Sequence, residues 1–152
     1  MNTMPKYVYP VLLVLLLAVL LPACAARVPA QTVEEEPKGA PDRLEIVYFH
    51  RANPCHCMAV VEDYIRAVLY LDFNRELDNG KLAYKSIVSD DPKNREIVAK
   101  YRAYLFQLFF TEYRGKQERT YPVDGIWALR DDPEKLKAFL REAIRKSLNG
   151  EM

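Results

Sequence analysis

Apolar residues form one dense stretch near the N-terminus and then recur at strand and helix spacing from about residue 44 onward. The N-terminal stretch, Val11 to Leu21, is an unbroken run of 11 apolar residues that follows Lys6. A run of this length is too short to cross a hydrocarbon layer of roughly 30 Å, but it is typical of the core of a secretory signal. The pattern predicts that residues 1–23 are a signal peptide and that the chain is exported.

The residues after the apolar run resemble a bacterial lipobox. Leu21-Pro22-Ala23-Cys24 has a small residue before a cysteine and a leucine three positions before it. The resemblance implies that Cys24 becomes an N-terminus acylated with a lipid such as palmitate. We therefore expect a lipoprotein on the extracytoplasmic face of the cell membrane. Ordinary cleavage near Cys24 is the alternative, and it would give a secreted or periplasmic protein.

Residues 24–42 have the composition of a flexible tether. They contain Pro29, Pro37, Pro41 and the acidic run Glu34 to Glu36, without hydrophobic periodicity. Such a segment cannot bury apolar surface and stays solvated. We expect one folded domain over residues 43–152.

The folded part alternates between strand and helix patterns. Leu44 to Phe49 is rich in β-branched and aromatic residues, which is typical of a buried strand, and the apolar spacing after Cys57 indicates one face of a helix. Asp91-Pro92 and Asp132-Pro133 each match a helix cap followed by a first-turn proline. The expected elements are strand 44–49, helix 57–73, strand 82–88, a helix from Pro92, strands 105–113 and 118–123, and a closing helix from Pro133. This βαβαββα order predicts an α/β domain.

Composition and charge exclude several functions. The chain has 152 residues, with 22 Lys plus Arg against 21 Asp plus Glu, so no basic groove for nucleic acid is expected. Removal of residues 1–23 takes away Lys6 and leaves a formally neutral chain, so membrane attachment would depend on the lipid. The sequence lacks a Gly-rich phosphate loop, and we expect no nucleotide, flavin or nicotinamide cofactor.

The candidate chemistry lies in Cys55-His56-Cys57. A cysteine at a helix N-terminus faces free backbone N–H groups and the positive end of the helix dipole, which favour thiolate over thiol. Cys55 is expected there as the nucleophile, with Cys57 to resolve a mixed disulfide and His56 to add positive charge. Export places these thiols in an oxidising compartment. The pattern predicts a candidate thiol–disulfide oxidoreductase with a protein thiol or disulfide as partner.

The element order, with paired cysteines after the first strand, resembles a thioredoxin-like domain. More closely, the chain from Leu44 to Leu148 resembles the ArsF family of small nitroreductase subunits. The matching segments are Val47-Tyr48-Phe49-His50, Glu62, Asp90 to Arg95 and Gly125-Ile126-Trp127. The resemblance implies a thioredoxin-like fold and a redox or redox-accessory role.

Two features depart from that pattern. Thioredoxin-like enzymes space their cysteines Cys-x-x-Cys, whereas here the usual second position is Met58. A disulfide between residues i and i+2 closes a smaller ring, and we expect a more oxidising couple. These enzymes also have a cis-proline before the third strand, whereas residues 102–106 contain no proline.

The missing proline favours a second hypothesis, a module that binds a soft metal or metalloid such as Cu(I), Zn or arsenite. Cys55, His56 and Cys57 supply soft ligands, and His50 and Met58 could complete the set. A structural zinc site needs four ligands, usually from two separated pairs, and this chain has one cluster. His50 is otherwise a turn residue.

Three further alternatives stay open. Cys55 and Cys57 could form an inert structural disulfide, although so short a loop removes little chain entropy. Glu62 is either a surface residue or a carboxylate that assists proton transfer to the resolving thiol. The aromatic residues form the core or, in part, an exposed docking patch near the cysteines. They are Tyr101, Tyr104, Phe106, Phe109, Phe110 and Trp127.

Overall fold

The structure is a computed structural model that describes residues 39–152. The predicted signal peptide, Cys24 and most of the predicted tether lie outside the described residues. Within residues 39–152, no helix has the length and apolar character needed to span a bilayer.

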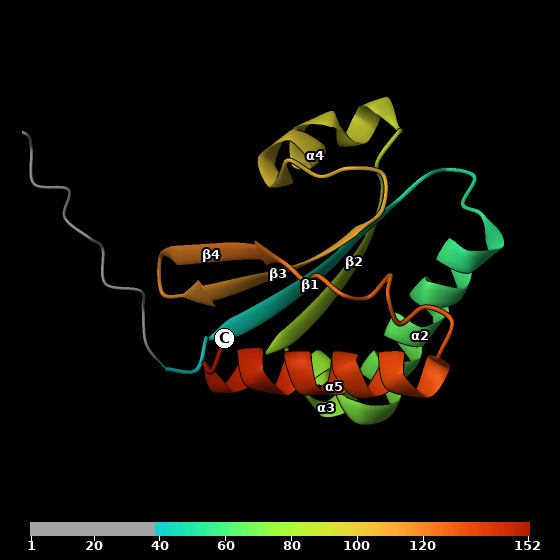
Figure 1. Ribbon diagram of the computed structural model, residues 1–152. Coiled ribbons are helices and arrows are strands. Elements are labelled where there is room, and N and C mark those ends of the chain that lie inside the picture. The colour runs from blue at the N-terminus through green and yellow to red at the C-terminus, as the bar shows by residue number, and fades with distance from the viewer. Residues whose placement is uncertain (1–38) are drawn as a thin grey trace, which may run out of the picture. The chain divides into compact units, whose positions relative to one another are not determined.

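A mixed four-stranded sheet forms the centre of the domain (Figure 1). Its order is β2-β1-β3-β4, with β1 (Arg43–His50) parallel to β2 (Leu82–Val88) and antiparallel to β3 (Gln107–Arg114). The edge strand β4 (Gln117–Pro122) pairs with β3 in a hairpin. β1 is therefore flanked by strands on both sides, and six of its eight residues are buried.

The helices follow the predicted order. They are α2 (His56–Asp72), α4 (Arg95–Tyr101) and α5 (Pro133–Asn149), with a short α3 (Asn74–Asp78) that the sequence reading missed. The α/β class is confirmed for the described residues, and so is the βαβαββα order apart from the additional α3. A helix as short as α3 shows no apolar periodicity, so the pattern contained no signal for it.

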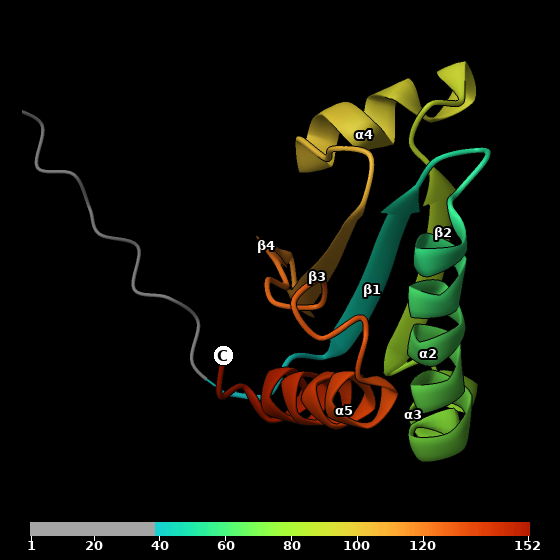
Figure 2. The same ribbon diagram turned by 45° about the vertical axis from the view of Figure 1, so that its right-hand side comes forward.

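The sheet buries both of its faces. Side chains alternate along a strand, so Ile46 and Tyr48 enter the main core with α2 and α5. Val47 and Phe49 point the other way and pack with Tyr101 of α4. Figure 2 shows α2 and α4 on different sides of the sheet. Because both faces of β1 are covered, the loop that follows it starts from a buried strand.

Both predicted proline caps are present. Asp91 accepts a hydrogen bond from the Lys93 backbone N–H at 2.9 Å, and Asp132 accepts one from Lys135 at 3.1 Å. The first cap differs in one respect, because the chain after Asp91 forms a 3-10 turn, η1 (Pro92–Asn94), before α4 begins. The predicted α-helix therefore starts three residues later than expected.

The predicted start of the third strand is wrong. β3 begins at Gln107, and Leu105 belongs to a loop that starts where Arg102 ends α4 in the left-handed region, with a φ of 48°. Tyr104 is 77% exposed in this loop. Its apolar residues resemble a strand in the sequence, but they lie on the surface, and periodicity does not separate these two cases.

The described chain begins beside its C-terminus, at the opposite end of β1 from the cysteine loop (Figure 1). Arg114 donates to the Gly39 carbonyl oxygen at 2.8 and 3.1 Å, and the Gly115 N–H donates to Asp42. These bonds hold residues 39–42 against the β3–β4 hairpin.

Candidate functional site

The site begins where β1 ends in a polar loop that leads directly into α2. Asn53 and Pro54 are exposed, and the residue that caps α2 is Cys55, with extended backbone at φ −65° and ψ 163°. The Cys55 carbonyl oxygen accepts bonds from the N–H groups of Met58 (3.0 Å) and Ala59 (3.2 Å). No side chain caps this helix, so the first N–H groups of α2 are free to face a charge at the Cys55 position.

Cys55 and Cys57 are close enough to form a disulfide, and they are bonded in this structure. Their Cα atoms are 5.5 Å apart, and both residues are exposed. The bond therefore spans the first turn of α2 on the outside of the domain. A reactant can reach the sulfur atoms without any part of the core opening.

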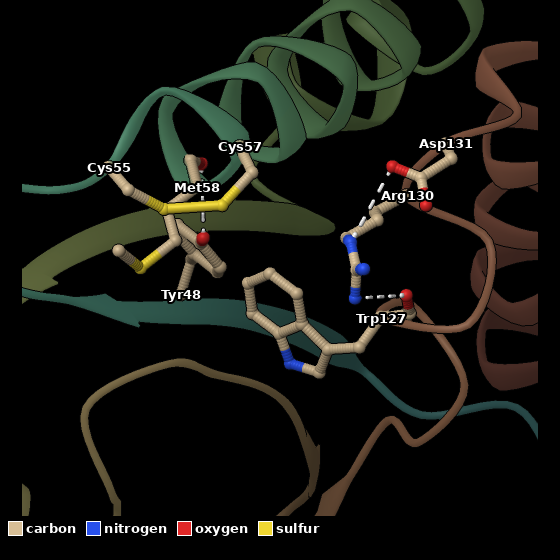
Figure 3. Close-up of a disulfide and its surroundings, with 7 residues drawn as sticks. All are labelled: Tyr48, Cys55, Cys57, Met58, Trp127, Arg130 and Asp131. Atoms are coloured by element: carbon tan, nitrogen blue, oxygen red, sulfur yellow. Dashed lines mark hydrogen bonds and ion pairs between the residues drawn. A yellow bond between two sulfur atoms is a disulfide. The ribbon is translucent and has the colours of Figure 1, made fainter.

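An open pocket of about 540 Å³ adjoins the disulfide. Figure 3 shows Met58 and the Trp127 ring on the same side of the disulfide. Three segments that are far apart in the sequence form the pocket: the start of α2, the end of the loop before β3, and the turn before α5. Its lining residues are Cys55, Cys57, Met58, Phe106, Trp127 and Arg130.

Met58 lines this pocket, and a hydrogen bond from β1 holds its backbone in place. Its residue is 8% exposed, and its carbonyl oxygen accepts a bond from the Tyr48 hydroxyl at 3.2 Å. Burial of Tyr48, together with the charge of Glu62, raises the pKa of that hydroxyl well above its usual value. Tyr48 therefore remains a protonated donor and fixes the first turn of α2 to the centre of β1.

The loop before β3 reaches the cysteines although it lacks a proline. Residues 39–152 contain no cis peptide bond, yet Phe106 at the end of this loop lines the disulfide pocket. Its ring meets the Trp127 ring edge-on, with centroids 6.0 Å apart. The neighbouring Ile126 is 1% exposed and anchors the Trp127 segment in the main core.

Arg130 is the charged residue of the pocket wall. Its Nη1 donates to the Trp127 carbonyl oxygen at 3.4 Å, and its Nε lies 3.6 Å from the Asp131 carboxylate. The Arg130 side chain is 47% exposed and that of Asp131 is 86% exposed. A weakly paired guanidinium thus stands beside an otherwise uncharged pocket (Figure 3).

The predicted metal-ligand set is not brought together. The Nδ1 of His50, at the end of β1, forms a hydrogen bond with the Arg51 carbonyl oxygen at 2.8 Å. The imidazole ring stacks on the Tyr48 ring, so both interactions are those of a residue in a turn, as expected. His56 is exposed in the first turn of α2, and neither histidine lines the disulfide pocket. Within residues 39–152, no group of three or more His, Cys, Asp or Glu side chains is arranged to hold a metal ion.

Glu62 faces the sheet below α2. Its side chain is 17% exposed, pairs with Arg66 at 2.7 Å and accepts a bond from the Tyr84 hydroxyl at 3.3 Å. Burial alone would raise the pKa of this carboxyl, but hydrogen bonds from Arg66 and Ser86 and the positive charges of Arg66 and His50 lower it overall. Glu62 is thus neither an exposed residue nor part of the pocket wall, and its role in proton transfer stays a prediction.

Sequence reasoning recognised the cysteines and Met58 but missed Arg130. Phe106 and Trp127 were expected mainly in packing, with an exposed patch near the cysteines as the alternative, and both line the disulfide pocket. Of the aromatic residues considered for an exposed patch, Tyr104 is exposed, whereas Tyr101, Phe109 and Phe110 are buried. Nothing in the sequence distinguished Arg130 from the other bases.

No protein-family model matches this sequence, and no curated protein is significantly similar to it.

Proposed function

We propose that this chain is an extracytoplasmic thiol–disulfide exchange protein that uses Cys55 and Cys57. The observation that carries the proposal is the exposed disulfide on the first turn of α2, next to an open pocket. Structural disulfides are most useful when they close long loops, whereas this one closes a loop of only three residues on the surface. An accessible pair at a helix N-terminus is the arrangement that thiol exchange requires.

The fold supports a thioredoxin-like assignment. A parallel β1–β2 pair joined through α2, followed by α4, an antiparallel hairpin and α5, matches the element order that the sequence resemblance implies. The cysteines follow the central strand, and the loop before β3 lies beside them, as in that fold. The Cys-x-Cys spacing and the missing proline are the differences that set this chain apart.

The exchange reaction can be written with its atoms balanced. In the reduced protein, the Cys55 thiolate attacks one sulfur of a substrate disulfide, a mixed disulfide forms, and one substrate thiolate leaves. The Cys57 thiolate then attacks the Cys55 sulfur, restores the Cys55–Cys57 bond and releases the second substrate thiolate. Two electrons pass from the protein to the substrate. With an oxidised protein and a dithiol partner, the same steps run in reverse.

Attachment through Cys24 would suit this reaction. The described chain starts at the end of β1 that is remote from the cysteines (Figure 1). β1 has eight residues and spans about 25 Å at roughly 3.3 Å per residue. A lipid on Cys24 would thus be joined to the domain at the end of β1 opposite the disulfide.

Trapping of the mixed disulfide tests the proposal. In the full chain, Cys57→Ser should accumulate disulfide-linked complexes that a reductant dissolves, because the resolving thiol is gone. Cys55→Ser should lose exchange with a disulfide substrate. The double variant Cys55→Ser/Cys57→Ser is the control for adducts of Cys24. If the two single variants exchange thiols as the natural protein does, the proposal is wrong.

The anchor is tested separately. Cys24→Ser should move the protein from the membrane fraction to the soluble fraction, and mass spectrometry of the natural protein should find an acylated Cys24 at its N-terminus. A membrane-bound Cys24→Ser variant would contradict the lipid anchor and leave the redox proposal intact.

A further inference from the structure

The pocket beside the disulfide has walls of two kinds, and this difference bears on the substrate. Met58, Phe106 and Trp127 make an apolar surface, and Arg130 adds a positive charge at one side. Tyr104 and Leu105, which precede Phe106 in the loop before β3, do not line the pocket but are 77% and 40% exposed. Apolar surface next to an accessible reactive group is typical of a recognition site.

The charge of Arg130 is available to a ligand. Its Nε faces Asp131 and its Nη1 donates to a backbone oxygen, so within residues 39–152 its Nη2 group has no hydrogen-bond partner. Asp131 is 86% exposed and lies 3.6 Å away, which makes the pair weak. Figure 3 shows the guanidinium between Asp131 and Trp127. An anionic group in the pocket can therefore replace water around this guanidinium.

We propose that Arg130 and the Phe106–Trp127 pair select the substrate, a protein segment that has an apolar side chain and a carboxylate beside its reacting cysteine. This inference rests on the exchange function proposed above. The apolar side chain would pack against the Phe106 and Trp127 rings. The carboxylate would pair with Arg130, and the reacting sulfur would lie against the cysteines at the start of α2.

Rates with matched peptide disulfides test the selection. The pre-reduced full chain is mixed with symmetric disulfides of three capped tripeptides, Phe-Cys-Glu, Phe-Cys-Gln and Ser-Cys-Glu, and oxidation of the protein is followed. We expect Phe-Cys-Glu to react about two- to fivefold faster than Phe-Cys-Gln, the range of a half-exposed ion pair, with the gap closing at high salt. Phe-Cys-Glu should also react faster than Ser-Cys-Glu.

Charge variants of opposite sign locate the effect. Arg130→Gln should remove the preference for Glu over Gln, whereas Asp131→Asn should enlarge it because the competing carboxylate is gone. Arg145→Gln, which removes an exposed base on α5 outside the pocket, is the matched control and should change nothing. Each variant is therefore compared through the ratio of its rates with Phe-Cys-Glu and Phe-Cys-Gln, which isolates the effect of charge from any change in the overall rate.

The outcomes distinguish a failure of substrate selection from a failure of the proposed exchange function. If the reduced protein reacts with all three peptides at equal rates, the selection is wrong and the exchange function stands. If a Glu preference survives Arg130→Gln, the assignment to Arg130 is wrong. If no peptide disulfide is reduced faster by the natural protein than by the double cysteine variant, the exchange function itself fails.

Discussion

Reduction of the Cys55–Cys57 disulfide should leave the domain folded, because the bond closes a loop of only three residues. In the chain-entropy model such a loop contributes about 1.6 kcal/mol at 25 °C. Domains of this size are commonly stable by about 5–15 kcal/mol. Both cysteines are also exposed and absent from the two core clusters, so the reduced protein loses no core packing.

Urea unfolding followed by circular dichroism, with and without reductant, measures this difference. With an m-value of about 1–3 kcal/mol per molar urea, we expect the midpoint to fall by roughly 1 M at an unchanged slope. Cys55→Ser/Cys57→Ser should match the reduced protein and should not respond to reductant. A reduced protein that is unfolded without urea would refute the reasoning and would make the disulfide a structural one.

Three further outcomes are expected. Trp127 is the single tryptophan of the chain and shares the pocket with the disulfide, so its fluorescence should rise on reduction, and a constant signal would contradict the pocket geometry. Burial alone would raise the pKa of Glu112, but hydrogen bonds from Arg114, Tyr121 and Ser147 lower it overall. Because the folded state lowers this pKa, the ionised carboxylate stabilises the fold above the pKa of the unfolded chain, about 4.3, and this stabilisation is lost as the pH falls. Glu112→Gln should therefore cost about 2 kcal/mol at pH 7 and less in acid, measured by urea unfolding at both pH values, and an equal loss at both would contradict the lowered pKa. Equilibration with glutathione buffers should give a reduction potential above about −270 mV, the thioredoxin value, because the ring is small, and a lower value would count against this expectation.

The strands and caps were predictable because their signals are local. β2 matches the expected range of 82–88, and Asp132-Pro133 begins α5 as expected. β4 runs one residue ahead of its expected range, because the hairpin turn has only two residues, Gly115 and Lys116, where the expected strand ranges left residues 114–117. These features depend on alternation, capping and turn chemistry within a few residues.

The buried polar residues were not predictable in this way. Glu112 lies on β3 with less than 2% of its surface exposed, next to Ser147 of α5, which is also fully buried. In the sequence, a glutamate in a strand and a serine in a helix read as exposed positions. Their burial depends on Tyr121 and Arg114, partners that only the folded chain brings together.

The pocket was unpredictable for the same reason, although its cysteines were obvious. The residues that surround the sulfurs come from three segments, and tertiary contacts bring these segments together. Phe106 meets Trp127, while Ile126 is held in the core and the Val123 N–H bonds the Leu108 carbonyl oxygen at 2.8 Å. Periodicity along the chain cannot show such contacts between turns.

The way these walls are held bears on how the site would act. Met58 is anchored by Tyr48, and the Phe106–Trp127 contact depends on Ile126 in the core. None of these anchors involves a sulfur of the disulfide, so the recognition surface persists whether the cysteines are bonded or free. A protein of this kind would bind a substrate in both redox states, and the direction of electron flow would be set by the relative potentials of protein and partner. In the proposed function, the site would thus give specificity through the fixed pocket and leave the driving force to the two sulfur atoms.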